Sequence, residues 1–401
     1  MQAPEELAPY FKGVTEAGAG INDFERERVL ASVHANRAGY DLMPSFEPVG
    51  DSSYQLDLVP GTQLVNPGSV RVNLSNVGNR FVGREFLDLE ARRGDHWGDE
   101  FQVLARTASS ILNVDEKEPG SDYHENQLGW SRVTPYGIFG INGQYLDYRQ
   151  QASGIALNGE LWKVDANWTG IVHASPTDRL SVQGRLDYTH KNLKLNSDGQ
   201  LIQKEPYPSI ELGTAYSSTF GLFGQGFLGT AGLSARKGFG NADPQYTVAN
   251  LSYWLVRPSY VLRTQSEPFA VELQLTGQYS SETVPEQQQW ILGGVGNLHA
   301  YVPGVGLGDR GGLARLVGEY SGYEYLGVRL KPKVFIEYGL ADYRHATAGR
   351  QAGVQSVADI GAEVVAQVGR YFEAAVAAAA PVVDDNISQS NRDLTRTDFF
   401  F

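Results

Sequence analysis

The chain ends in Leu394–Phe401, LTRTDFFF, in which Phe401, Phe399, Thr397 and Thr395 occupy alternate positions. Alternate side chains of a β-strand share one face, so this tail predicts a strand that closes on an aromatic residue. Such a tail is typical of a transmembrane β-barrel, although an edge strand of a soluble sheet has the same pattern. We interpret Phe399 and Phe401 as a C-terminal barrel signal because the preceding sequence repeats the alternation.

Alternating segments recur from about residue 69 onward. Val70 and Val72 alternate with Arg71 and Asn73, and the next segments repeat the pattern. The charged positions of these first segments are Arg71, Asp88, Glu90 and Arg106. In a soluble sheet the apolar face would point to a core. In a barrel it points to lipid and the charged face to a wet lumen.

Further segments with this pattern extend to the C-terminus. They lie near 142–150, 159–166, 179–188, 209–217, 226–236, 246–254, 259–264, 269–280, 313–321, 324–329, 333–340, 357–368, 370–380 and 393–401. Bacterial barrels close with an even number of strands. We therefore expect an all-β transmembrane barrel of about sixteen antiparallel strands over residues 66–401.

The composition agrees with a barrel. The 401 residues include 46 Gly, 21 Tyr and 17 Phe, which suit turns and interfacial aromatic girdles, and the mean hydropathy is −0.31. The most apolar run, 374–383, contains Pro381 and is about half as long as the roughly 20 residues that a spanning helix needs. Residues 1–12 lack the features of a signal peptide, so we expect a processed or truncated N-terminus.

Several classes of function find no support in the sequence. A net charge of −13 without a Lys/Arg cluster argues against nucleic acid. Absent cysteine removes any disulfide, CxxC zinc site or cysteine nucleophile, and the seven histidines have no metal spacing. Gly306–Gly311 matches GxGxxG, but the next segment has strand periodicity instead of a helix. We expect no enzyme, no cofactor and no metal.

Residues 1–65 differ from the rest and predict a small α+β module. Asn22 is a plausible N-cap with Glu25 as its capping-box partner, and the helix should end near Gly39. Two short strands, about 43–48 and 54–59, should follow. Such a thin core needs support from another part of the protein.

One glycine-rich segment, Gln289–Gly312, separates two predicted strands and reads QWILGGVGNLHAYVPGVGLGDRGG. A loop of more than 20 residues inside a compact fold is usually functional or disordered, and its Leu, Val and Tyr content argues against disorder. It could fold back into the lumen, at 293–312, or lie on the surface.

This segment resembles the signature of two-partner secretion transporters, which export filamentous haemagglutinins and haemolysins and share a superfamily with BamA-type assembly proteins. The matching motifs are WILGG at 290–294, LHAY at 298–301, GDRG at 308–311 and FIEYG at 335–339. Residues 73–83 are similar to the family's first strand and turn, GDHWGD at 94–99 to a later turn, and residues 1–65 to its last periplasmic POTRA module.

The resemblance implies roles for individual residues. Leu292, Gly293 and Gly294 would form the loop-entry motif. The gating motif in the pore loop would consist of Leu298, His299, Ala300, Tyr301, Gly308, Asp309 and Gly311. Glu337 would be the partner of the loop on the inner wall. The family has an arginine and an aspartate where this chain has His299 and Glu337. A His–Glu pair keeps one hydrogen bond and depends on pH, so the resemblance implies a weaker latch. Alternatively, His299 points to water.

The function implied is an outer-membrane pore that exports an unfolded exoprotein without ATP, with the N-terminal module in the periplasm of a Gram-negative bacterium. Its expected partners are that exoprotein, outer-membrane lipid and, through the C-terminal strand, the barrel-assembly machinery; the resemblance suggests a monomer. Members of the family usually carry a plug helix and two POTRA modules, and we expect residues 1–65 to hold at most one such module, or part of one. Two alternatives are an assembly or insertion factor of the same superfamily and a diffusion porin.

Overall fold

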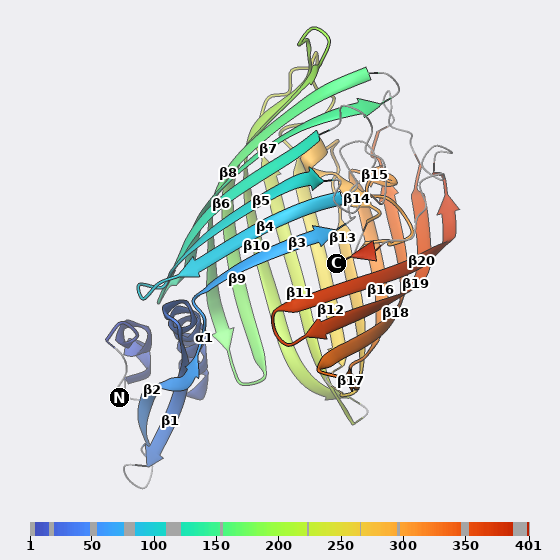
Figure 1. Cartoon of the computed structure of the whole chain (residues 1–401). Coiled ribbons are helices and arrows are strands. Elements are labelled where there is room, and N and C mark those ends of the chain that lie inside the picture. Colours follow the sequence, from blue (N-terminus) through green and yellow to red (C-terminus); the bar gives the residue numbers. More distant parts are fainter. Residues whose placement is uncertain are drawn as a thin grey trace.

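The computed structural model describes residues 5–15, 20–48, 54–75, 85–109, 122–152, 155–222, 224–264, 266–294, 297–345, 353–387 and 399–400. A closed antiparallel barrel forms the larger part of the molecule, with a small module below one edge of it (Figure 1). Among the described residues no helix is both long and apolar enough to cross a membrane.

The barrel has sixteen strands within the described ranges, plus the short strand β17, which lies beside β18 after β16 has ended. The strands are β3 Gly68–Ser75, β4 Glu85–Gly94, β5 Asp99–Ser109, β6 Asp122–Thr134, β7 Gly137–Ala152, β8 Ile155–Ala174, β9 Asp178–Leu195, β10 Leu201–Leu222, β11 Gln225–Gly238, β12 Trp254–Thr264, β13 Phe269–Gln278, β16 Arg310–Tyr320, β17 Tyr323–Tyr325, β18 Val328–Asp342, β19 Gln355–Val368, β20 Phe372–Asp385 and β21 Phe399–Phe400. The circle closes where β21 pairs with β3. The predicted antiparallel barrel and its number of strands are confirmed.

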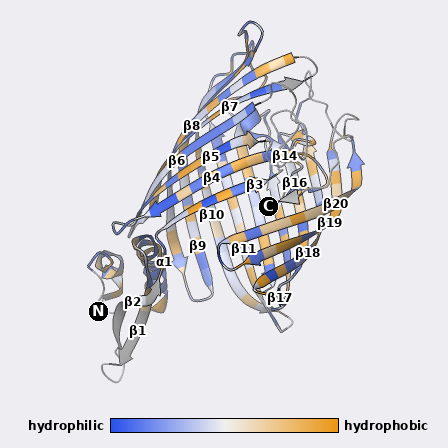
Figure 2. Cartoon of the chain, viewed as in Figure 1, coloured by the Kyte–Doolittle hydropathy of each residue, from blue (hydrophilic) through white to orange (hydrophobic). Residues whose placement is uncertain are grey.

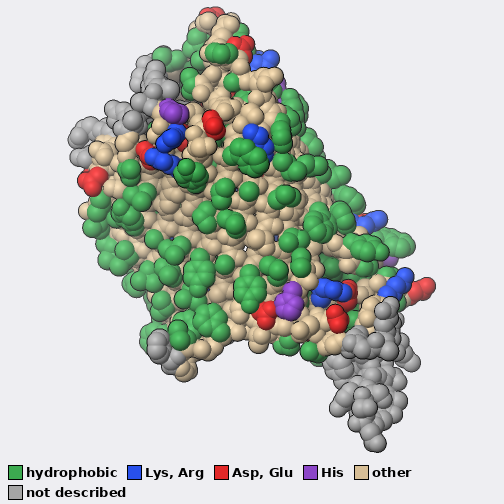
Figure 3. Space-filling view, turned by 180° about the vertical axis from the view of Figure 1, so that it is seen from behind, with side chains coloured by type: hydrophobic (Ala, Val, Ile, Leu, Met, Phe, Trp, Pro, Cys, Tyr) green, Lys and Arg blue, Asp and Glu red, His purple; other side chains and the backbone are tan. Residues whose placement is uncertain are grey.

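The outer surface of the barrel is apolar. Val70, Leu89, Val103 and Leu128 are all exposed, and each alternates with a polar residue whose side chain points inward. The alternation is visible as bands along the strands (Figure 2), and in the space-filling view charged side chains gather at the two rims (Figure 3). A polar inner face and an apolar outer face form the pattern of a barrel in a bilayer.

Three strand predictions were wrong. The strand β6 at 122–134 was missed. The segment 246–254 was predicted as a strand but mostly belongs to the connection before β12, where alternate residues are buried against other lumen segments. The segment 324–329 is not one strand, because it covers the end of the short β17, a turn and the first residues of β18, which runs from 328 to 342 and includes 333–340. In the tail, Phe399 and Phe400 pair with β20, whereas 388–398 and Phe401 lie outside the described residues.

The N-terminal module contains a 3-10 helix η1 Ala8–Thr15, the helix α1 Ile21–Ala38, and a hairpin of β1 Tyr40–Pro48 and β2 Tyr54–Leu64. Gly20, and not Asn22, caps α1, and its N–H donates to Oδ2 of Asp23 at 3.0 Å. The helix ends at Gly39 in the left-handed conformation, as predicted. The predicted hairpin is present, although both strands are longer than expected and its turn lies outside the described residues.

The module packs on the end of the barrel where the strands are joined by short turns. Its apolar core includes Leu30 and Phe24 of α1 and is completed by Val133 of β6, with Ile138 and Ile171 beside it. The Arg37 guanidinium donates to the carbonyl oxygens of Gly98 and Ser131 at 2.9 and 3.2 Å. Burial lowers the pKa of Arg37, which Glu100 and Asp99 oppose. The barrel therefore supplies the support that so small a core needs.

Candidate functional site

The connection between β13 and β16 folds into the barrel. Its two short strands, β14 Trp290–Leu292 and β15 Gly306–Gly308, pair with each other and carry the tip between them. The tip is closed by backbone hydrogen bonds, among them Gly294 N–H to the Tyr301 oxygen at 2.8 Å and Gly304 N–H to the Leu292 oxygen at 2.9 Å. In its described residues, 290–294 and 297–308, the predicted loop thus forms a hairpin, which we call the lumen hairpin (290–308).

The lumen hairpin has an apolar seat on the inner wall. Leu292, Leu298 and Tyr301 are buried against Ala341 of β18 and Val357 of β19. The wall residues here are small, which leaves space for the larger side chains of the hairpin. Packing of this kind holds the hairpin against one side of the lumen.

The FIEYG motif is the part of β18 that faces the hairpin. Phe335, Glu337 and Gly339 are alternate residues and therefore point to the same, inner side. The His299 ring lies 4.4 Å from the Phe335 ring, and its Nδ1 donates to Oε2 of Glu337 at 2.8 Å. A Cβ on Gly339 would lie 2.7 Å from Leu292 and 2.8 Å from Leu298. Each inward residue of the motif thus has a contact with the hairpin.

Backbone groups of the tip strengthen this contact. The N–H of His299 donates to the same Glu337 oxygen at 3.0 Å, and the next N–H, of Ala300, donates to Oδ2 of Asp359 at 2.8 Å. The Tyr301 hydroxyl donates to the Val383 carbonyl oxygen at 2.7 Å. His299 therefore points into the wall, not to water: its ring makes the one hydrogen bond expected of a His–Glu pair, and its backbone N–H adds a second.

An arginine is present at this site, but it comes from the wall. Nε of Arg315, on β16, lies 2.7 Å from Oε1 of Glu337. The strand registers place Arg315, Glu337 and Asp359 next to one another across β16, β18 and β19. One cation and two carboxylates thus form a row under the tip, in which Glu337 and Asp359 are fully buried.

Asp309 holds the end of the hairpin. This buried carboxylate accepts the N–H of Val284 through Oδ1 and the N–H of Arg344 through Oδ2, both at 2.9 Å. It thereby joins the segment before the hairpin to the end of β18. Gly308 and Gly311 lie in tight places: a Cβ would be 2.5 Å from the Asp342 nitrogen or the Leu340 oxygen, respectively. Gly311 belongs to β16 and not to the loop.

The loop-entry residues form the turn after β14. Leu292 is fully buried, and Gly293 and Gly294 both have φ of +94°, which side chains rarely adopt. A Cβ on Gly293 would lie 2.1 Å from the Val302 oxygen. This turn therefore requires glycine at 293 both for its conformation and for space.

A second part of the wall is covered by residues 279–289. Arg236 and Arg257 both donate to Oε1 of Gln288, at 2.9 and 3.1 Å. Lys191 of β9 pairs with Glu286. The connection between β11 and β12 joins this segment, because Asn250 N–H donates to the Thr283 oxygen at 2.7 Å. The inner wall is therefore covered at β9–β12 as well as at β16–β20.

The structure brings the predicted residues Leu292, Leu298, His299, Tyr301 and Glu337 into one cluster, while Asp309 and Gly311 support its base. Arg315, Asp359 and Gln288 also belong to the contacts of these segments, and no motif in the sequence singled them out. Strand registers, which the sequence alone did not indicate, make Arg315 and Asp359 neighbours of Glu337, whereas Gln288 lies on a short 3-10 helix, Glu286–Gln288, in the connection before the hairpin. Within the described ranges, no group of three or more His, Asp or Glu is placed to hold a metal ion.

Comparisons with known proteins agree with this geometry. Residues 66–362 match the family model of the haemolysin secretion/activation protein ShlB/FhaC/HecB. This chain belongs to that family. It is thus an outer-membrane β-barrel of the two-partner secretion type, and the expected membrane is confirmed.

Similar individual proteins are of the same kind. The heme/hemopexin transporter protein HuxB of Haemophilus influenzae is 24% identical over 346 residues, which are 80% of this chain and 57% of HuxB. The chain spans little more than half of that relative. CdiB from Escherichia coli superimposes with a TM-score of 0.81 at 14% identity, covering 99% of this chain and 73% of CdiB.

Two more solved structures share the fold. CdiB from Acinetobacter baumannii gives a TM-score of 0.72 at 14% identity, covering 100% of this chain and 70% of that one. BamA from Haemophilus ducreyi, lacking POTRA domains 1–3, gives 0.58 at 14% identity, covering 100% and 81%.

Proposed function

We propose that this chain is an outer-membrane pore that exports a partner exoprotein from the periplasm to the cell surface without ATP. The observation that carries the proposal is the lumen hairpin, tied by His299 and Ala300 to carboxylates of the inner wall. A family member with an ordered hairpin inside a polar lumen has a path through the membrane and an element that can occupy it.

In this proposal Leu298, His299, Ala300 and Tyr301 form the gating tip, Gly308, Asp309 and Gly311 its base, and Glu337 its partner on the wall. The contacts of the tip are directional hydrogen bonds, so a displaced tip can return to one position. Folding of the exoprotein outside the cell would bias its movement outward.

Residues 1–65 would act as a POTRA-like periplasmic module and residues 66–401 as the pore. The two-stranded sheet of β1 and β2 offers backbone groups with which an unfolded exoprotein could pair by β-augmentation. The terminal strand, with Phe399 and Phe401, would be read by the barrel-assembly machinery. The chain would act as a monomer in outer-membrane lipid.

A secretome comparison tests the proposal. Culture media from cells with the intact gene, without it, and with residues 297–303 of the hairpin deleted are compared by mass spectrometry, with Glu363→Gln as a control on the same wall. Glu363 pairs with Lys333 at 3.3 Å and is on β19, outside the hairpin contacts named above. We expect one large protein to disappear from the medium of both mutants and to remain with the control.

Other results would contradict export. If the media are identical while other barrels are lost from the outer membrane, the chain is an assembly factor. If neither changes, and purified protein conducts steadily in planar bilayers, the chain is a diffusion porin.

A further inference from the structure

The inner face of β5–β8 carries a group of uncharged amide side chains. They are Gln102, Gln127, Asn142, Gln144 and Asn167, and all five are half-buried. Strand registers place them side by side: Gln102 lies opposite Gly129, Gln127 opposite Gln144, and Asn142 opposite Asp165. We call this surface the amide lane.

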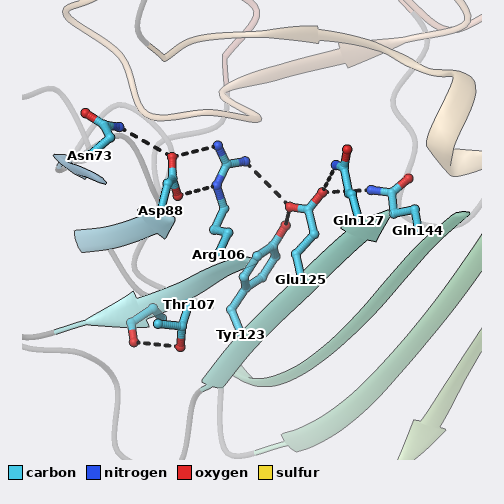
Figure 4. A network of polar contacts seen from close by, with 9 residues as sticks. Asn73, Asp88, Arg106, Thr107, Tyr123, Glu125, Gln127 and Gln144 are labelled. Atoms are coloured by element: carbon cyan, nitrogen blue, oxygen red, sulfur yellow. Dashed lines mark hydrogen bonds and ion pairs between the residues drawn. The ribbon is translucent and has the colours of Figure 1, made fainter. Parts of the chain in front are cut away.

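Carboxylates of the wall orient these amides. Gln127 and Gln144 both donate to Oε1 of Glu125, the latter at 2.8 Å (Figure 4). Glu125 in turn lies 3.5 Å from Arg106, which makes a bidentate pair with Asp88.

The same arrangement occurs at the other amides. Asn142 and Asn167 donate to Oδ2 of Asp165 at 2.9 and 3.0 Å, and Gln102 donates to Oε1 of Glu90 at 3.3 Å.

These contacts determine which atoms of each amide remain able to form a hydrogen bond with another molecule. An ionised carboxylate only accepts hydrogen bonds, so the NH₂ group of each amide must face it. Among the described residues, no donor is bonded to the amide oxygens of the lane. These oxygens are therefore acceptors without a protein donor on a wall that faces the lumen.

Two glycines flatten the lane. A Cβ on Gly129 would lie 2.8 Å from Oδ1 of Asn142, and a Cβ on Gly140 would lie 2.8 Å from Oδ1 of Asn167. The asparagine oxygens thus lie directly above strand positions that have no side chain. An extended chain can approach such a surface closely.

The lane also begins where the periplasmic module ends. Ser131 and Val133 of β6, which contact Arg37 and the apolar core of the module, continue the inward face that carries Gln127 and Gly129. On the walls at β9–β12 and β16–β20, inward residues such as Glu205 and Glu337 are fully buried and accept hydrogen bonds from the folded connections, whereas the five amides of the lane are half-buried.

We infer that the amide lane is the surface along which the main chain of an extended polypeptide passes through the pore, its backbone N–H groups donating to the amide oxygens. This inference rests on the proposed function. Neutral acceptors suit a passing substrate, because each hydrogen bond contributes little net free energy and does not depend on the substrate's side chains. Charged acceptors would bind more tightly and would select for sequence.

The first test measures export by pulse–chase, using the protein that the secretome comparison identifies. The variant Gln127→Met/Asn142→Leu/Gln144→Met removes three acceptors. We expect release to slow about tenfold, with unchanged barrel amount and heat-modifiable mobility. Asn126→Leu, the adjacent residue on the lipid face, and Gln274→Met, on β13, should both export as the wild type does. Normal export by the triple variant, or an equal defect in Gln274→Met, would overturn the inference.

The second test needs neither a variant nor the natural substrate. Purified full-length protein in detergent is mixed with a glycine–serine peptide that carries one photoreactive group, and cross-linked residues are found by mass spectrometry. We expect cross-links within 99–174, reduced about fivefold when the peptide backbone is N-methylated and has no N–H to donate. Cross-links spread over all strands, unchanged by N-methylation, or absent would overturn the lane. This result stands even if secretion proves not to depend on the chain.

Discussion

His299 meets Glu337 through two groups at once: its backbone N–H and its ring Nδ1 both donate to Oε2, at 3.0 and 2.8 Å. The other oxygen of Glu337 lies 2.7 Å from Arg315 Nε. Both oxygens of one buried carboxylate are therefore engaged, one by the hairpin and one by the wall. Glu337 therefore connects the tip of the hairpin to the inner wall of the barrel.

Removing Glu337 should release the tip. In Glu337→Ala the Arg315 cation loses its buried partner and two donors of His299 lose their acceptor, a change that typically costs about 3–5 kcal/mol. Glu337→Gln keeps one acceptor oxygen and should have a smaller effect. We expect proteinase K to cut purified Glu337→Ala within 297–305 much faster than the wild type.

The matched control for this prediction is Glu363→Ala. Glu363 is also an inward carboxylate paired with a cation, Lys333, at 3.3 Å. Its removal should leave cleavage of the hairpin unchanged. Equal cleavage rates for Glu337→Ala and the wild type would show that apolar packing alone holds the tip.

The barrel could be predicted from sequence because apolar and polar residues alternate within its strands along most of the chain. This alternation remains recognisable even where the end of a strand is predicted wrongly. The expected number of sixteen was right because bacterial barrels close with an even number of strands, and not because every strand was identified: β6 was missed, while the division of β18 and the false strand at 246–254 added two. In that false strand Leu251 and Tyr253 are buried at alternate positions, as in a barrel strand, but against Tyr207 and Val284 inside the lumen. The alternation of apolar residues does not show whether they face lipid or another part of the protein.

The site could be predicted only in part. The residues of the hairpin, and Glu337 on the wall, could be identified because they belong to motifs that lie close together in the sequence. Asp359 and Arg315 become neighbours of Glu337 only through the registers of three strands, each set by a long-range pairing. The same limit hid the amide lane, whose members are spread over 66 positions, from Gln102 to Asn167.

Asp309 should matter more for the base of the hairpin than for its tip. In Asp309→Ala the buried N–H of Val284 and the partly buried N–H of Arg344 lose an ionised acceptor, and a hydrogen bond to a charged group contributes about 1.5–3 kcal/mol. We expect hydrogen–deuterium exchange to rise in 281–289 and 343–345. Asp309→Asn keeps one acceptor oxygen and should expose only one of the two segments. Unchanged exchange in both variants would contradict this role.

Two adjacent glycines on β16 provide a matched pair. A Cβ at Gly311 would lie 2.1 Å from Trp290 and 2.5 Å from the Leu340 oxygen, whereas at Gly312 the nearest atom, the Thr276 oxygen, is 3.7 Å away. Gly311→Ala should therefore displace Trp290 and with it the start of the hairpin. Gly312→Ala should be close to neutral. The two variants would be compared with the wild type by tryptophan fluorescence and by the temperature at which the compact gel band is lost. A larger change in Gly312→Ala than in Gly311→Ala would refute the steric argument.

We expect Arg37 to help hold the N-terminal module against the barrel. Its guanidinium contacts Gly98, Ser131 and Glu100, and Arg37→Met would remove these bonds while keeping most of the apolar length of the side chain. We expect amide exchange in α1 to rise about tenfold and exchange in β8 to stay the same, because the barrel needs no support from the module. Arg28→Met is the control, since Arg28 pairs with Glu25 of its own helix at 2.7 Å. Equal exchange in the two variants would mean that the apolar contact with Val133 is sufficient to hold the module.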